Sequence, residues 1–143
     1  MNREFKDAIE NSPIIAAIKN DAELHQCLTC DSQVIFILYG DLCNIADIVD
    51  TVKSAGKIAL VHLDLIGGLN AKEIAVDFIK KYTRADGIIS TRPQLIRHAK
   101  ELSLYTVMRF FVIDSMAYDN IEKQLHAVRP DFIEILPALM PKV

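Results

Sequence analysis

A chain of 143 residues, 51% of them hydrophobic and 24% charged, predicts one folded domain over residues 1–143 with a sizeable core. No apolar run approaches the ~20 residues of a membrane span. The polar N-terminus also lacks the apolar stretch of a signal peptide, so we expect a cytoplasmic protein with no membrane partner. The formal net charge of −3 argues against nucleic acid as a partner, although a local basic patch stays open.

Six short apolar runs alternate with helical patterns along the chain. The predicted strands cover residues 14–18, 34–39, 57–68 with its glycine turn, 87–90, 105–113 and 132–136. They recur at roughly 20 to 25 residues, which is typical of βαβ units. The pattern therefore predicts a parallel sheet with right-handed crossovers.

Helix signals fill the segments between these strands, and a further short helix or an extended arm is predicted over 1–11. We predict helix starts at Asn20 or Asp21, at Asp41, at the capping-box pairs Asn70–Glu73 and Thr91–Gln94, and at Asp114 or Ser115. Gly56 and Pro130 are predicted to end two of the helices. The buried stripe expected for the helix after Glu73 consists of Ile74, Phe78, Ile79 and Tyr82.

The stretch 57–68, KIALVHLDLIGG, carries polar groups inside an apolar strand. By the period of two, Leu60, His62 and Asp64 share one face, and Val61, Leu63 and Leu65 share the other. Asp64 comes last, where α/β folds place groups that contact ligands. The following glycines are expected to turn the chain and leave their amides accessible.

Two architectures compete for this pattern. A closed (β/α)8 barrel needs eight strands and typically ~250 residues, so an open doubly wound sheet fits the length better. His62, Arg109 and Glu134, however, put polar groups in mid-strand, and a barrel interior accommodates these near its mouth. We therefore predict an α/β, TIM-barrel-like fold with about six βα units, a barrel that lacks its last two.

The candidate site residues each have a structural alternative. Arg109 and Glu134 form either a structural ion pair or a ligand site in which arginine holds an anion and glutamate accepts from hydroxyls. Lys19 is either a solvated strand end or part of the same mouth. His62 is better explained as a core histidine, whereas the strand-end position of Asp64 favours a ligand role.

Ser90, Thr91 and Arg92 leave the fourth strand at the start of a helix, which is a natural anion site. Their alternative is plain capping, expected for Thr91 in any case. The CxxC of Cys27 and Cys30 lies late in a helix, without a second pair, so neither redox chemistry nor zinc is expected. No metal or cofactor is predicted.

Several segments taken together resemble the glycerol-3-phosphate-responsive antiterminator family. They are PIIAAIKN at 13–20, VHLDLIGG at 61–68, DGIISTR at 86–92, RFFVIDS at 109–115 and PDFIEILPALMPKV at 130–143. The resemblance implies a TIM-barrel regulator that is not an enzyme. It also implies glycerol 3-phosphate as effector and leader mRNA of glycerol-utilisation genes as target.

The resemblance carries site roles over to the barrel-mouth positions of this sequence, Lys19, Asp64, Ser90, Thr91, Arg92, Arg109 and Glu134. Family members continue through two further βα units, whose loops form the usual phosphate cradle of such barrels. The alternatives are a TIM-barrel enzyme on a small phosphorylated substrate and an inactive, truncated remnant. Uncovered edge strands also favour pairing, which makes a homodimer a further hypothesis.

Overall fold

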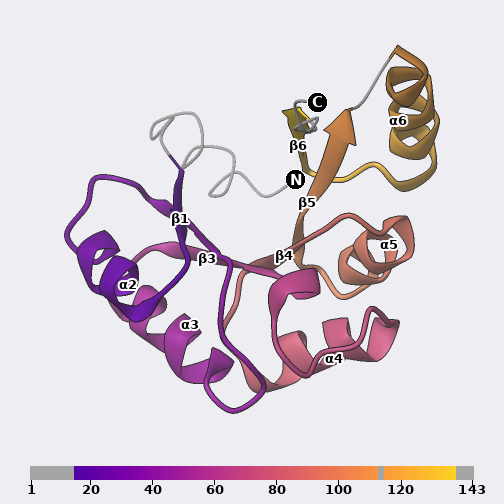
Figure 1. The fold of residues 1–143 in the computed structure, drawn as a ribbon. Helices are drawn as coiled ribbons and strands as arrows, with labels where there is room; N and C mark the ends of the chain where they lie inside the picture. Colours follow the sequence, from indigo (N-terminus) through magenta and orange to yellow (C-terminus); the bar gives the residue numbers. More distant parts are fainter. Residues whose placement is uncertain (1–14, 113–114, 138–143) are drawn as a thin grey trace, which may run out of the picture.

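The computed structural model describes residues 15–112 and 115–137, and the helix or arm predicted over 1–11 lies outside them. The strands are β1 (Ala16–Ile18), β2 (Val34–Ile37), β3 (Ile58–His62), β4 (Gly87–Ser90), β5 (Tyr105–Val112) and β6 (Phe132–Pro137). The helices are α2 (Asp21–Cys27), α3 (Ile45–Ser54), α4 (Glu73–Tyr82), α5 (Pro93–Glu101) and α6 (Ser115–Val128), with a 3-10 turn, η1 (Leu63–Leu65). The strands pair in parallel and in chain order. They curl into a half-barrel (Figure 1), which confirms the predicted incomplete TIM-barrel-like fold.

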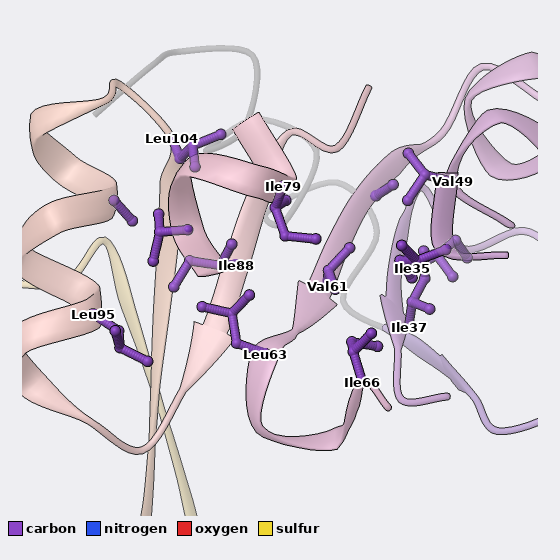
Figure 2. Packing of buried hydrophobic residues seen from close by; sticks show 14 of the residues in the cluster. Ile35, Ile37, Val49, Val61, Leu63, Ile66, Ile79, Ile88, Leu95 and Leu104 are labelled. Carbon is purple, nitrogen blue, oxygen red and sulfur yellow. The ribbon is translucent and has the colours of Figure 1, made fainter. Parts of the chain in front are cut away.

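The larger hydrophobic core lies between the outer face of the sheet and the helices. Strand side chains of alternate residues meet the apolar stripes of the helices there (Figure 2), among them Ile35, Ile37, Val61, Ile88, Val49, Ile79 and Leu95. All seven are fully excluded from solvent. Full burial of one such side chain stabilises the fold by roughly 1.5–3 kcal/mol, so this layer fixes the strands that carry the polar residues.

The inner face of the half-barrel has a smaller core of its own, formed by Val34, Phe36, Ile58, Leu60, Ile89 and Val107. In the register of β3, β4 and β5, His62 lies beside Ile89, and Ile89 lies beside Val107. Two residues further along, Arg109 of β5 lies beside Glu134 of β6. The inner face therefore changes from apolar to charged toward the carboxyl ends of the strands.

The stretch 57–68 departs from the prediction after its first half. The β3 ladder to β4 ends at His62, and the next residues, without strand partners, form η1. Asp64 therefore lies on a 3-10 turn rather than a strand, and Leu65 is 48% exposed. The amide of Gly67 was predicted to be accessible, but it donates to the Gly40 carbonyl at 2.9 Å.

The start of α4 and part of its buried stripe were predicted wrongly. The helix begins at Glu73 with Lys72 as N-cap and no side-chain cap, so Asn70 and Glu73 do not form a capping box. Ile74 is 64% exposed and Tyr82 is 60% exposed. The buried residues are Ala75, Val76 and Ile79. Ile79 lies in the core and Phe78 packs against it, as predicted, whereas Ala75 and Val76 rather than Ile74 and Tyr82 complete the buried face.

The second predicted capping box is also absent. Helix α5 begins at Pro93, a residue suited to the first helical turn, and its N-cap is Arg92, without a side-chain cap bond. The hydroxyl of Thr91 donates instead to the Asp64 carboxylate at 3.2 Å. The expected capping role of Thr91 is therefore wrong, because the helix begins one residue later than the capping box requires, with Arg92 at the N-cap.

Of two further predicted helix starts, one is correct and the other lies four residues too early. The side chain of Asn20 caps α2 by accepting from the Glu23 amide at 2.8 Å, as predicted. Helix α3 begins at Ile45 rather than at Asp41. The Asp41 carboxylate accepts from the Asn44 amide at 3.2 Å, so it closes a turn just before the helix.

The predicted helix ends are confirmed. Gly56 follows α3 with a φ of +75°, which suits glycine. After α6, Arg129 takes a φ of +52° and is followed by Pro130. No helix in residues 15–112 and 115–137 combines the length and the apolar character that a membrane crossing needs.

Candidate ligand-binding site

The ion pair of Arg109 and Glu134 lies on the inner face near the carboxyl ends of β5 and β6. The Arg109 Nη2 atom lies 3.3 Å from both Glu134 carboxylate oxygens, and its Nε atom lies 3.4 Å from Oε2. Their side chains are 13% and 28% exposed. Tight charge-assisted bonds of this kind are about 2.7–2.9 Å long. The three contacts are within hydrogen-bond range, and each is longer than a tight charge-assisted bond.

Asp64 connects η1 to the loop between β4 and α5. Its carboxylate accepts from the Ser90 hydroxyl at 3.3 Å, the Thr91 amide at 3.1 Å and the Thr91 hydroxyl at 3.2 Å. The Arg92 Nε atom lies 3.9 Å away and adds an opposite charge. The Arg92 amide donates to the Ser90 hydroxyl at 3.1 Å. The loop is thus organised around this one carboxylate.

These contacts change how the start of α5 can bind an anion. The sequence predicts that free donors before this helix hold a ligand phosphate. In the structure, the Asp64 carboxylate already accepts bonds from Ser90 and Thr91. A phosphate at this position must displace the carboxylate or share its donors. The ligand role of the loop therefore stays a prediction that has to include this competition.

Lys19 follows β1 directly, at the carboxyl end of that strand. Its backbone amide donates to the Glu23 carboxylate at 3.3 Å. The residue is exposed, and its ammonium group contacts no other described residue closely enough for a hydrogen bond or an ion pair. Since alternate residues share a face, Lys19 continues the inner face of Ala17. The ligand role of Lys19 stays a prediction.

An apolar cavity of about 320 Å³ opens on the inner face between β1 and β6, and its size suits a small ligand. Its lining consists of Ile15, Ala17, Phe36, Val107, Arg109, Phe132, Ile133 and Glu134. Of the predicted site residues it brings Arg109 and Glu134 together. Lys19, Asp64, Ser90, Thr91 and Arg92 do not line it. The predicted site therefore consists of two parts, the cavity and the loop around Asp64.

A larger hollow of about 470 Å³ lies at the opposite end of the strands, lined by Lys80, Ala85, Asp86, Lys100, Ser103, Leu104, Tyr105 and Asp131. Barrel proteins place their sites at the carboxyl ends of the strands. Within this hollow, Lys100 already donates to the Arg129 carbonyl, and Asp86 is bound by Lys53 at 2.8 Å. We therefore place the candidate site at the smaller cavity.

Two aspartates have a structural role that no motif in the sequence indicates. Asp86, just before β4, accepts from the Ala59 amide at 2.8 Å. Asp131, just before β6, accepts in the same way from the Thr106 amide at 2.8 Å. Each ties the start of its strand to the preceding strand. An aspartate directly before a short apolar run is the signal that would have found them.

Cys27 and Cys30 lie where the sequence places them, at and after the end of α2. The Cys27 thiol donates to the Leu24 carbonyl at 3.1 Å. Burial, with a smaller contribution from Cys30, raises the pKa of the Cys27 thiol above its ordinary value. Reactive cysteines need a lowered pKa. Burial thus acts against thiolate formation at Cys27, and the expectation for this CxxC stays a prediction.

The fold and the site define a class of protein, a (β/α) half-barrel with charged residues at the carboxyl ends of its strands and no catalytic motif in the sequence. The sequence model of one family, described as "Glycerol-3-phosphate responsive antiterminator", matches residues 14–143. The chain belongs to this family. It is therefore a member of a family of regulators, which favours a regulator over an enzyme on a phosphorylated substrate.

Three proteins illustrate the similarity. The chain is 42% identical over 135 residues to the uncharacterized protein YgcP of Escherichia coli K12, covering 94% of this chain and 71% of YgcP. It is similar to the glycerol uptake operon antiterminator regulatory protein of Listeria monocytogenes 4b F2365, with a TM-score of 0.81, 34% identity, and 89% and 69% of the two chains covered. It is also similar to a glycerol uptake operon antiterminator-related protein of Thermotoga maritima, with a TM-score of 0.77 and 32% identity. That match covers 85% of this chain and 69% of the Thermotoga chain.

Proposed function

We propose that this protein is a cytoplasmic transcription antiterminator that responds to glycerol 3-phosphate and acts on leader RNA of genes for glycerol metabolism. The observation that carries the proposal is the family match over residues 14–143. The charged residues at the carboxyl ends of β5 and β6 supply the chemistry for a small anionic effector. The RNA partner rests on the family alone, since the net charge of −3 does not favour it.

The proposed effector site starts from the ion pair. The Arg109 guanidinium suits a phosphate because it donates two parallel hydrogen bonds. Its present bonds to Glu134 are long, so an incoming phosphate can replace them. The freed Glu134 carboxylate then accepts hydrogen bonds from the hydroxyl groups of the effector. One ligand with an anionic end and a hydroxyl end therefore satisfies both halves of the pair.

The remaining predicted residues form the outer part of the proposed site. Lys19 offers a second positive charge at the end of β1. Ser90, Thr91 and Arg92 offer hydroxyl, amide and guanidinium donors, which Asp64 holds in place. We propose that all of them lie at the mouth through which the effector enters. No cofactor takes part in this proposal.

The proposal includes the absence of catalysis. The competing hypothesis, an enzyme on a small phosphorylated substrate, would use Asp64, Arg109 and Glu134 as acid–base groups. Each of the three is already engaged by protein partners, which suits binding and positioning. Turnover of a phosphorylated triol or sugar that disappears in Glu134→Gln would support the enzyme instead.

Thermal unfolding with ligand tests the effector directly. A ligand that binds only the folded state stabilises it by about 2.7 kcal/mol at a hundredfold excess over Kd, which raises the Tm by roughly 5–10 °C. We expect this shift with glycerol 3-phosphate and not with glycerol or inorganic phosphate at equal concentration. The Arg109→Gln variant should lose most of the shift.

Arg97→Gln is the matched control, because Arg97 is an exposed arginine on α5 away from the cavity. It should keep the full shift. A cooperative unfolding transition that glycerol 3-phosphate leaves unchanged in the wild type would contradict the proposal. A shift of equal size in Arg109→Gln would place the effector elsewhere.

A further inference from the structure

His62 is a buried polar residue that lacks a partner. The residue is 3% exposed, and neither of its ring nitrogens has a hydrogen-bond partner among the described residues. It closes β3 at the point where η1 begins. A buried group that can donate and accept normally has at least one partner. This imidazole is therefore the exception that needs an explanation.

The position of His62 relates it to the proposed effector site. It shares the inner face with Leu60, whose side chain belongs to the inner core. In the strand register, it lies one inward-facing layer below the level of Arg109 and Glu134. The charged groups that act on its ring are Arg109 and Asp64. Two residues of the proposed site are thus its electrostatic neighbours.

A purely structural role explains this residue poorly. Leaving a buried polar group without a hydrogen bond is unfavourable, whereas an apolar residue of similar size fits such a position without loss. The neighbouring inner-face residues, Leu60 and Ile89, show that apolar side chains fit this surface. Residues that weaken the fold without structural gain are typical of functional sites.

We infer that His62 contacts a hydroxyl group of the glyceryl part of the effector, below the phosphate held by Arg109. This inference rests on the proposed function and adds the residue that reads the hydroxyl end of the ligand. A neutral imidazole has one N–H donor and one acceptor nitrogen. A hydroxyl group also donates one bond and accepts others, so the two are matched.

The environment of the ring supports the neutral form. Burial, and then the positive charge of Arg109, lowers the pKa of His62, although Asp64 acts in the opposite direction. Neutral imidazole binds a hydroxyl with one donor and one acceptor, whereas imidazolium, with two donors, would favour the phosphate end. The depth of His62 and its neutral state thus favour the uncharged part of the ligand.

Because the ring nitrogens are shielded from water, a neighbouring group has to move before a ligand reaches them. Arg109 is the group we expect to move, since its contacts with Glu134 are 3.3–3.4 Å long. Its shift toward the phosphate would also open the way from the adjacent cavity. Binding at the two ends of the ligand is therefore coupled.

The test compares two ligands on three proteins. Calorimetry measures the affinity for glycerol 3-phosphate and for 3-hydroxypropyl phosphate, which lacks only the central hydroxyl, in the wild type, His62→Leu and His62→Gln. We expect the wild type to prefer glycerol 3-phosphate. His62→Leu should weaken its binding about tenfold or more and remove the preference. His62→Gln, which keeps a donor and an acceptor, should restore part of it.

Stability without ligand gives the second readout. The apolar His62→Leu variant should melt at or above the Tm of the wild type, because it removes an unpartnered polar group. His98→Gln, far from the mouth between α4 and α5, is the matched control and should keep the ligand preference. If His62→Leu fails to fold, His62→Phe, closer in shape to imidazole, takes its place.

The outcomes are distinguishable from those of the proposed function. A wild type that does not bind glycerol 3-phosphate would overturn the proposed function and this inference together. A wild type that binds it, with an unchanged ligand preference in His62→Leu, would overturn the inference alone. A lower Tm of His62→Leu without ligand, combined with that unchanged preference, would assign His62 to the core.

Discussion

The Asp64 side chain holds in place a loop that is distant from it in the sequence. Its partners Ser90 and Thr91 are 26 and 27 positions away, and its side chain is 21% exposed. Several donors converge on one carboxylate, which therefore acts as an internal anion at the start of α5. The same contacts align the donors that we propose for the effector.

Replacement of Asp64 by asparagine should therefore destabilise the protein. The amide keeps one acceptor but removes the charge and turns a donor toward other donors, a loss of about 1–2 kcal/mol. Asp47→Asn removes an exposed charge on α3, without a side-chain hydrogen bond to a described residue, and should cost less than about 0.5 kcal/mol. Urea unfolding measures both, and equal stability of the two variants would contradict the role of Asp64.

At the scale of elements, a histidine clamps α4 to α5. The His98 Nε2 atom lies 2.8 Å from Asp77 of α4, and its Nδ1 atom lies 3.3 Å from Glu101 and 3.9 Å from Glu73. The bond to Asp77, followed by smaller effects of these carboxylates, raises the pKa of His98 above its ordinary value. The helix pair is thus held more firmly when His98 is protonated.

The clamp predicts a pH dependence with a definite sign. Because the pKa is higher in the folded state, the contribution of His98 is fully present below the unfolded pKa of about 6.5. It is lost as the pH rises through the folded value. The Tm difference between wild type and His98→Gln should therefore shrink from pH 5.5 to pH 8.5. A Tm difference that grows over this range would contradict the clamp. Groups that titrate in both proteins cancel in the difference between wild type and His98→Gln.

Element by element, periodicity predicted the strands better than local motifs predicted the helix starts. The fourth strand, Gly87–Ser90, lies where its apolar pattern places it, because burial decides its position. The capping boxes at Asn70 and Thr91 failed, because α4 and α5 begin later than the motifs require, with Lys72 and Arg92 at their N-caps. The alternation of side chains along a strand was enough to predict that Arg109 and Glu134 lie on the inner face of the sheet. The partners of Asp64 could not be predicted in this way, because they come from a loop that is distant in the sequence.

At the scale of the molecule, the described residues form a half-barrel that is open between its first and last strands. In the described part of the chain, β1 and β6 are the edge strands of the sheet (Figure 1). The apolar cavity, with the ion pair of Arg109 and Glu134 in its lining, lies between them. The chain covers 69% of each of the two solved relatives. Unpaired edges attract other strands, so pairing of two copies stays a hypothesis for this surface. The effector site, on our account, uses the same open side.

Transcription through a terminator tests the account most directly. The template carries the leader of a glycerol uptake operon from the organism that supplies this sequence, and read-through is measured with and without the purified protein. We predict that the protein raises read-through with glycerol 3-phosphate, and that glycerol or inorganic phosphate does not replace it. Arg109→Gln should lose this response while Arg97→Gln keeps it. Read-through that is independent of glycerol 3-phosphate in the wild type would contradict the account.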